Sequence, residues 1–380
     1  MKTPSIPIEN QAPMRRNGRS TRCLGALMKI DRRRFLAYAG ASLTASQLVA
    51  CGENKIATKG IPRSRFSEAS TAEEVTEGID LTGRVAVVTG CTSGIGLETM
   101  RVLASRGAYV IGSSRSLERA EEACRSVVGV TSPVSLDLGN FESVVQCAES
   151  IRAMKVPIDM LICNAGYLGG GNEKQLIDGV EKHFVINHLG HFIFVNRLLD
   201  RLFIAEQGRI VIVASRTAYT DAPSDGILFD DLNFSYDYSD RMAYGHSKLA
   251  NVLFSLRLST LLKGTRISCN SLHPGIIDTE IDRNFNSFMQ FGMKMYAAVG
   301  GKTIQEGAAT TCYLATNAAL ATTTGAYFED CNAVTVLGNN HMHDVPMSEK
   351  LVQVSEEITA DFLVDQKYPT KESLLDDRSS

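Results

Sequence analysis

Tyr244 and Lys248 are the residues whose types and spacing point most directly to chemistry. They bound the run Tyr-Gly-His-Ser-Lys at the start of a helix expected over about 242–262. Residues four apart lie on one face of a helix, so the lysine ammonium can lie near the phenol. A tyrosine normally has a pKa near ~10, and a nearby cation favours its phenolate. The pair therefore predicts an acid–base group for an alcohol or a carbonyl, although this spacing alone is more often structural.

A glycine-rich turn is the second candidate, because it stands between a predicted strand over 84–89 and a predicted helix over 94–105. Its sequence is Thr89-Gly90-Cys91-Thr92-Ser93-Gly94-Ile95-Gly96. Glycines allow a tight turn and close approach of backbone to a pyrophosphate, and the helix N-terminus favours the anion. A lone glycine-rich turn is often only a loop, but the strand–helix context is the one that a dinucleotide site requires. The predicted contacts are Gly90, Ser93, Gly94, Ile95 and Gly96.

The residues after the second predicted strand bear on cofactor choice. An NAD site usually has an acidic residue there for the ribose 2′-hydroxyl, whereas an arginine suits a 2′-phosphate. Ser114 and Arg115 follow this strand and no acid is present. We therefore expect NADP(H) to be preferred, with NAD(H) as the alternative if Arg115 is only a solvated charge.

Strands and helices alternate from about residue 81 onward. The apolar strands, each followed by a helix, predict a mostly parallel sheet covered on both faces, which is a doubly wound (Rossmann) α/β fold in a single domain. Ligands of such sheets bind beyond the carboxyl ends of the strands. The predicted strands lie at about 84–89, 109–112, 134–136, 159–163, 209–213, 266–270 and 325–328.

The motifs together resemble the short-chain dehydrogenase/reductase family. They are Gly-x-x-x-Gly-x-Gly in the turn, Asn164-Ala165-Gly166 after the fourth strand, Ser215 at the end of the fifth, and Tyr244-x-x-x-Lys248. The resemblance implies that Tyr244 is the acid–base group, and that the Ser215 hydroxyl hydrogen-bonds the substrate oxygen where negative charge develops.

Further site residues are implied only by this resemblance. Asn187 would hold a water that relays protons to Lys248, and Lys248 would also contact the nicotinamide ribose, as Tyr244 would contact the cofactor. The remaining cofactor contacts would be Asp137, Leu138, Asn164, Ala165, Gly166, Pro274, Gly275 and Thr279. A homo-oligomer is also expected by resemblance. His188 and His191 have a spacing that metal ligands can use, but without a third ligand we expect packing residues and no metal.

Longer strings are similar to the branch of retinol dehydrogenases and WW-domain oxidoreductases, over about residues 79–335. They include Tyr-Gly-His-Ser-Lys-Leu-Ala-Asn-Val-Leu-Phe from Tyr244 and Asn-His-Leu-Gly-His-Phe from Asn187. The resemblance implies a lipophilic alcohol, aldehyde or ketone substrate, such as a retinoid, steroid or lipid. The Met- and Phe-rich stretch over 285–296 suits an apolar ligand or a lid helix equally. A non-enzymatic, membrane-tethered dinucleotide-binding scaffold or sensor is the alternative function.

Composition excludes several classes. Residues 1–50 hold nine Lys/Arg and two Asp/Glu, so the net charge of −3 leaves −10 on residues 51–380. Such an acidic domain does not suit nucleic acid, which is held mainly by neutralising phosphates. The nine cysteines show no C-x-x-C spacing, so neither a zinc site nor a disulfide framework is indicated.

The first fifty residues resemble an export signal. Asp31-Arg32-Arg33-Arg34-Phe35-Leu36 resembles a twin-arginine motif, and an uncharged stretch follows, too short for a spanning helix. Leu48-Val49-Ala50-Cys51 resembles a lipobox, which implies a lipid anchor at Cys51 and a membrane-anchored or periplasmic protein. The alternative is a basic tail on a cytoplasmic enzyme, and residues 1–27 need not be translated, since Met28 is a more natural start.

The expected domain organisation follows from these observations. We expect a signal region over 1–50, a polar linker over 51–78, the dinucleotide-binding domain over 79–340 and a C-terminal extension over 341–380.

Overall fold

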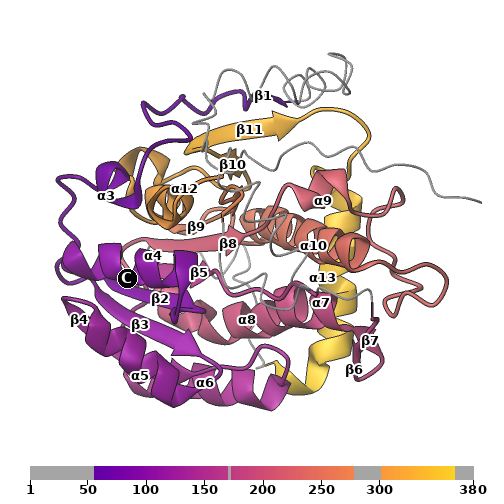
Figure 1. The fold of residues 1–380 in the computed structure, drawn as a ribbon, viewed down its shortest axis with the longest axis horizontal. Helices are drawn as coiled ribbons and strands as arrows, with labels where there is room; N and C mark the ends of the chain where they lie inside the picture. The colour runs from indigo at the N-terminus through magenta and orange to yellow at the C-terminus, as the bar shows by residue number, and fades with distance from the viewer. Residues whose placement is uncertain (1–54, 170–172, 278–300, 364–380) are drawn as a thin grey trace, which may run out of the picture. The chain divides into compact units, whose positions relative to one another are not determined.

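Seven parallel strands form the middle of the structure, a computed structural model that describes residues 55–169, 173–277 and 301–363. Two antiparallel strands, β11 and β1, extend this sheet at its β10 edge (Figure 1). All described residues belong to one unit of the chain, residues 54–380. In spatial order the strands are β1 (Lys55–Ala57), β11 (Asn332–Val336), β10 (Tyr327–Glu329), β9 (Ile267–His273), β8 (Gly208–Val213), β5 (Met160–Cys163), β2 (Val85–Thr89), β3 (Tyr109–Ser114) and β4 (Val130–Ser135).

Both faces of the sheet are buried, as its apolar strands require. Along β2, Val85 and Val87 belong to one hydrophobic core, while Ala86 and Val88 belong to the other. Successive side chains of a strand point to opposite faces, so an uninterrupted apolar run needs a cover on each side. The predicted doubly wound α/β fold is therefore confirmed.

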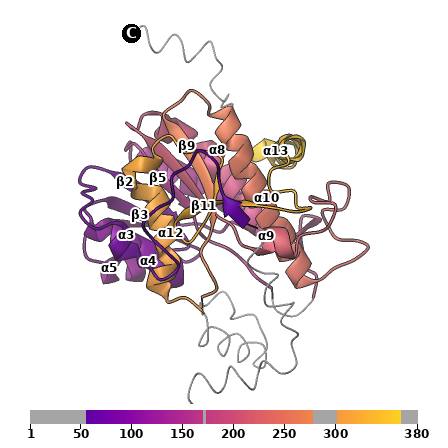
Figure 2. The same cartoon turned by 90° about the horizontal axis from the view of Figure 1, so that it is seen from above.

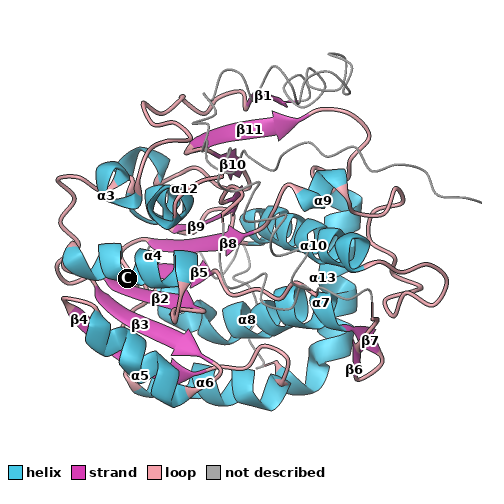
Figure 3. Ribbon diagram, in the orientation of Figure 1, coloured by secondary structure: helices cyan, strands magenta, loops and turns pink. Residues whose placement is uncertain are grey.

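Helices provide the two covers (Figure 3). In Figure 2, α4 and α12 lie on one side of β11, and α10 and α13 lie on the other. The first core takes side chains from α6 (Phe141–Ala153), α8 (Gly190–Phe203), α10 (Asp240–Leu261) and α13 (Val345–Thr359). The second takes side chains from α3 (Ala72–Val75), α4 (Gly94–Ser105), α5 (Leu117–Ser126) and α12 (Ile304–Thr316).

The chain reverses its direction of travel across the sheet at β2. It proceeds outward through β3 and β4, then returns to place β5 on the other side of β2. Crossover helices leave from this point in opposite directions, which opens a crevice at the carboxyl ends of β2 and β5. The glycine-rich turn, after β2, and the Asn-Ala-Gly turn, after β5, both lie at this crevice.

The region over 176–203 combines several kinds of secondary structure. It begins with a small hairpin of β6 (Leu176–Ile177) and β7 (Val180–Glu181), followed by α7 (Lys182–Phe184). A π-helical segment, Val185–Leu189, then leads into α8. Such segments occur frequently at functional sites. Two shorter helical segments, α9 (Thr217–Thr220) and a 3₁₀ turn (Ala318–Leu320), follow β8 and α12.

The expected linker over 51–78 needs correction, because its described part belongs to the domain. β1 pairs with β11, and Lys55 Nζ donates to the buried Glu329 carboxylate at 2.5 Å. In α3, the Thr71 side chain and Glu74 form a reciprocal capping box, and Ala72 and Val75 are buried. A polar composition hid these contacts, since only two residues of α3 face the core.

The C-terminal segment over 341–380 is likewise more than an extension where it is described. Leu351 and Val352 of α13 are buried against α10 in the first core, and a 3₁₀ turn, Ala360–Phe362, follows. No helix in the described ranges is both long enough and apolar enough to cross a membrane.

Candidate active site

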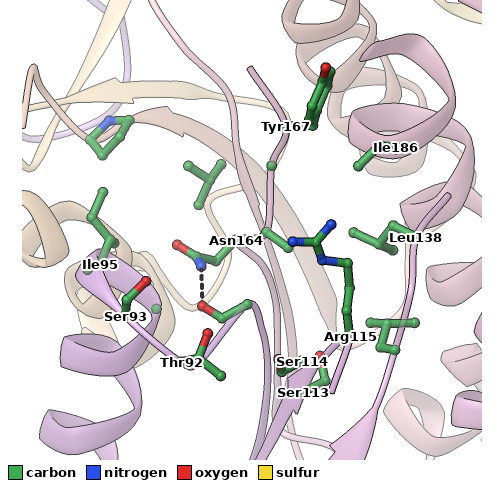
Figure 4. A pocket seen from close by; sticks show the side chains of 18 of the residues that line it. Thr92, Ser93, Ile95, Ser113, Ser114, Arg115, Leu138, Asn164, Tyr167 and Ile186 are labelled. Carbon is green, nitrogen blue, oxygen red and sulfur yellow. Dashed lines mark hydrogen bonds between the residues drawn. The ribbon is translucent and has the colours of Figure 1, made fainter. Parts of the chain in front are cut away.

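A cavity of about 630 Å³ lies at the carboxyl ends of the parallel strands. Its volume is in the range of small-molecule and cofactor sites. Figure 4 shows part of its lining, drawn from the turns after β2, β3 and β5. Ser114, from the cofactor argument, lines it, and so do sixteen of the predicted site residues: Gly90, Ser93, Gly94, Ile95, Gly96, Arg115, Asp137, Leu138, Asn164, Ala165, Gly166, Ser215, Tyr244, Lys248, Pro274 and Gly275.

Tyr244 and Lys248 reach the cavity from α10. The helix begins with Ser239, whose side chain accepts a hydrogen bond from the Met242 N–H, so the first turn is capped. Lys248 Nζ lies 5.5 Å from the centre of the Tyr244 ring and donates to the Val213 carbonyl at 3.0 Å. Burial lowers the pKa of Lys248 to about 8, so the group is still mostly charged at neutral pH.

Ser215 reaches the same cavity from the end of β8. It is 9% exposed, and its Oγ accepts a hydrogen bond from the Thr217 N–H at 3.2 Å. Accepting this bond leaves the hydroxyl hydrogen to be donated. The hydroxyl is therefore placed to donate to an oxygen in the cavity.

The glycines of the glycine-rich turn are at positions that disfavour a side chain. Gly90 has φ +72° and Gly94 has φ +54°, both in the left-handed region. A Cβ on Gly96 would collide with the Gly90 carbonyl and with Asn164 Nδ2. That amide holds the turn by donating to the Thr89 carbonyl at 2.9 Å.

The N-terminus of α4 points its unpaired N–H groups into this turn. Ser93 is the cap residue, yet its side chain makes no capping hydrogen bond. The Ser93 hydroxyl and the first N–H groups of the helix are thus free to bind an anion. The turn fits the pyrophosphate of a dinucleotide on these grounds.

Arg115 extends from the end of β3 into the cavity (Figure 4). It is exposed, and Asp137 is the only acidic residue among the described residues of the lining. The Asp137 carboxylate accepts from the Gly139 N–H at 3.0 Å, which ties it to its own turn.

Asn187 does not line the cavity but holds its wall. In the π-helical segment, its Oδ1 accepts from the Tyr167 N–H at 2.7 Å. Its Nδ2 donates to the Tyr167 carbonyl at 3.0 Å and to Ser247 Oγ at 2.9 Å. The side chain therefore positions the turn after β5 relative to α10. Its implied role in a proton relay stays a prediction.

Thr279, the last predicted contact, lies outside the described residues, as do the Met- and Phe-rich residues 285–296. The turn before it is described. Gly275 has φ +105°, and a Cβ there would meet the Lys302 side chain at 2.5 Å.

Sequence reasoning missed several residues of the site. Tyr167 lines the cavity, with Lys182 Nζ 4.5 Å from its ring centre on one side and the His183 ring 4.8 Å away. His273, buried at the end of β9, also lines it. Position after a buried parallel strand was the available signal for both, since Tyr167 follows β5 and His273 ends β9.

The two histidines next to Asn187 have separate partners. His188 Nε2 hydrogen-bonds Ser355 Oγ on α13 at 2.8 Å, whereas His191 bonds Thr89 and the Asn187 carbonyl. No group of His, Cys, Asp and Glu side chains in the described ranges is arranged to hold a metal ion.

The family model for short chain dehydrogenase matches residues 84–225. The chain is 40% identical to the chloroplastic short-chain dehydrogenase TIC 32 A of Brassica napus, over 76% of this chain and 92% of that protein. It is 37% identical to the WW domain-containing oxidoreductase of Gallus gallus, over 71% of this chain and 67% of that protein.

A further relative and a solved structure are also similar to this chain. Retinol dehydrogenase 11 of Mus musculus is 37% identical over 67% of this chain and 80% of that protein. A crystal structure from Mycobacterium paratuberculosis matches with a TM-score of 0.61 at 28% identity, over 80% of this chain and all of that chain. The protein belongs to the short-chain dehydrogenase/reductase family, in the branch of these relatives, and is an oxidoreductase of CH–OH groups that uses a nicotinamide dinucleotide.

Proposed function

We propose that the protein interconverts an alcohol and a carbonyl on an apolar small molecule with NADP(H), and that Tyr244 is its acid–base group. One observation carries this proposal: Tyr244, Lys248 and Ser215 line the same cavity as the glycine-rich turn. A dinucleotide bound along that turn would have its nicotinamide end toward the three side chains.

The residues of this chain have distinct roles in the proposed reaction. When bound, the nicotinamide supplies or accepts the hydride. In reduction, Tyr244 donates its phenolic proton to the substrate oxygen, and in oxidation the phenolate takes a proton from the alcohol. Ser215 donates a hydrogen bond to that oxygen, where negative charge develops. Lys248, charged at neutral pH, stabilises the phenolate across the 5.5 Å between ammonium and ring.

The preference for NADP(H) rests on Arg115. Its guanidinium lines the cavity just after β3, where a 2′-phosphate would lie, and neither Ser113 nor Ser114 carries a charge that would repel that phosphate. A charge-assisted hydrogen bond is worth about 1.5–3 kcal/mol, or roughly ten- to a hundredfold in affinity.

The apolar substrate is supported by the retinol dehydrogenase among the relatives and by the aromatic wall at Tyr167. Retinol itself is not carried over to this chain. A homo-oligomer, which the family resemblance implies, is part of the proposal and is tested by the mass of the purified protein in solution.

The experiment for the activity is a screen of the purified protein. In the direction of reduction, consumption of NADPH or NADH is measured with retinal and with aldehydes and ketones of increasing chain length. In the direction of oxidation, formation of NADPH or NADH is measured with the corresponding alcohols. We expect turnover that rises with apolar size and is faster with NADPH. No turnover of any carbonyl or alcohol with either dinucleotide would refute the activity.

For location, we propose export through the twin-arginine route and a lipid anchor at Cys51. That route carries folded cargo, so the enzyme would cross with its cofactor already bound. The segment that would connect Cys51 to the domain is short, because β1 begins at Lys55. Three residues separate Cys51 from β1, so the four residue steps between them span at most about 14 Å. The sheet edge at β1 would then lie close to the membrane. A cytoplasmic enzyme with a basic tail is the competing outcome, which cell fractionation decides.

A further inference from the structure

Thr89 lies at the end of β2, where four polar atoms are within hydrogen-bonding distance of its hydroxyl oxygen. Its Oγ1 accepts from the Asn164 N–H at 2.9 Å and from the Ala165 N–H at 2.9 Å. Two acceptances occupy both lone pairs of a hydroxyl oxygen. The hydroxyl hydrogen must therefore be donated, and His191 Nε2, at 3.0 Å, is closer than the Ile162 carbonyl at 3.4 Å.

This arrangement fixes the protonation of His191. Its Nε2 has to accept from Thr89, so that nitrogen carries no hydrogen. Its Nδ1 lies 3.1 Å from the Asn187 carbonyl, which can only accept. A neutral imidazole has one N–H, and here it can only be on Nδ1. Burial lowers the pKa of His191 to about 4, which agrees with a neutral ring.

The two ends of this bridge belong to different parts of the site. Thr89 fixes the Asn164–Ala165 turn, which lines the cofactor side of the cavity. Asn187 holds Tyr167 and Ser247, the latter one residue before Lys248. His191 is buried, at 2% exposure. Its hydrogen bond to Thr89 connects these two parts of the site, although the two residues are 102 positions apart in the sequence.

We propose that His191 is a positioning residue: as the Nδ1–H tautomer it bridges Thr89 and Asn187, and so holds the cofactor-binding turn in register with the catalytic helix. The inference rests on the proposed function for its consequence, because a displaced turn weakens dinucleotide binding before it affects chemistry. His191 itself touches neither cofactor nor substrate.

The tautomer is tested directly on the full chain. Long-range ¹H–¹⁵N correlation spectra of protein labelled at its seven histidines distinguish an Nδ1–H ring from an Nε2–H ring. The His191 signals are those that vanish in His191→Phe. An Nδ1–H pattern at neutral pH supports the bridge, and an Nε2–H or doubly protonated pattern overturns it, whatever the enzyme's activity.

The coupling is tested by NADPH titration, or by NADH titration if the wild type prefers it. His191→Phe keeps the ring volume and removes both hydrogen bonds. We expect the Kd to rise about tenfold, since a lost hydrogen bond that leaves its partner buried costs on the order of this factor. Thr89→Val should do the same, and Thr89→Ser should recover most of the difference because it keeps the hydroxyl.

His188→Phe is the matched control. His188 is a buried histidine three residues away, but its Nε2 bonds Ser355 on α13, away from the cavity. Its replacement should lower the thermal midpoint without changing the Kd. A double variant, Thr89→Val with His191→Phe, should bind no worse than either single variant.

Two results of the binding titrations would also overturn the proposal. One is a dinucleotide Kd of His191→Phe within twofold of wild type. The other is an equal loss of affinity in His188→Phe, which would make the effect one of general packing. If the wild type binds no dinucleotide at all, the proposed function fails, and the tautomer measurement still decides the bridge.

Discussion

Replacing Lys248 by Met should abolish turnover and at the same time stabilise the fold. Lys248 is 2% exposed and has no carboxylate among its hydrogen-bond partners, so the folded chain carries the cost of a buried ammonium. Its pKa falls from 10.5 to about 8 for this reason. At about 1.4 kcal/mol per pKa unit, the buried charge costs about 3 kcal/mol at pH 7. The variant also loses the hydrogen bond to the Val213 carbonyl, which lowers its stability by about 1 kcal/mol.

The net stabilisation expected at pH 7 is therefore about 2 kcal/mol, and it has a characteristic pH dependence. Below pH 8 the lysine is charged in both folded and unfolded states, and the whole cost is present. Between pH 8 and 10.5 the folded state loses the proton while the unfolded state keeps it, so the wild type gains stability as the pH rises. The advantage of the variant should accordingly shrink to near zero by pH 10.

Urea unfolding of the cofactor-free protein at pH 7, 8, 9 and 10 measures this difference. Other titrating groups cancel when the variant is compared with wild type at each pH. Lys263→Met, an exposed lysine just after α10, is the control and should change the free energy of unfolding by less than about 0.5 kcal/mol at every pH. A difference for Lys248→Met that is destabilising, or that stays constant from pH 7 to 10, would refute the buried-cation argument.

Three further outcomes are expected. Gly96→Ala should abolish dinucleotide binding and destabilise the fold by about 1–3 kcal/mol, because its Cβ meets the Gly90 carbonyl; Gly139→Ala, whose Cβ has only ordinary 3.4 Å contacts, should be tolerated in the same titration and thermal melt. Arg115→Ala combined with Ser114→Asp should move the ratio of NADPH to NADH affinity toward NADH by roughly ten- to a hundredfold, and an unchanged ratio would remove Arg115 from the cofactor site. Cys51→Ala should release the protein from the membrane fraction, whereas a wild-type chain found at full length in the cytosol would rule out the anchor.

The fold was predictable because its central strands are continuous apolar runs that are buried on both faces of the sheet. The first four residues of β2 are small or β-branched apolar residues that serve two cores, and such a run predicts a buried parallel strand. The antiparallel strands β1 and β11 gave no such signal. β1 has three residues, one of them Lys55, and its partner lies about 280 positions along the chain. Pairing at that separation is a tertiary property.

In the site, too, local features were predictable from the sequence, whereas contacts between distant elements were not. The Tyr244–Lys248 spacing, the glycine-rich turn and the position of Ser215 after a strand are local features, and local features place side chains on one face or at one end of a strand. The Thr89–His191 bridge depends on two elements meeting in space. The π-helical segment that carries Asn187 has the same apolar pattern as the flanking helices, so its altered hydrogen bonding was invisible in the sequence.

Turnover by Tyr244→Phe, measured beside its dinucleotide affinity, tests the central claim most directly. The variant removes only the phenolic hydroxyl, leaving the ring, Lys248 and the glycine-rich turn in place. With the best substrate from the carbonyl and alcohol screen, kcat should fall at least about a hundredfold, the usual contribution of a positioned acid–base group. The Kd for NADPH should stay within about threefold, since one lost hydrogen bond at most is at stake. Retention of most of the turnover, with dinucleotide binding intact, would contradict the assignment of Tyr244.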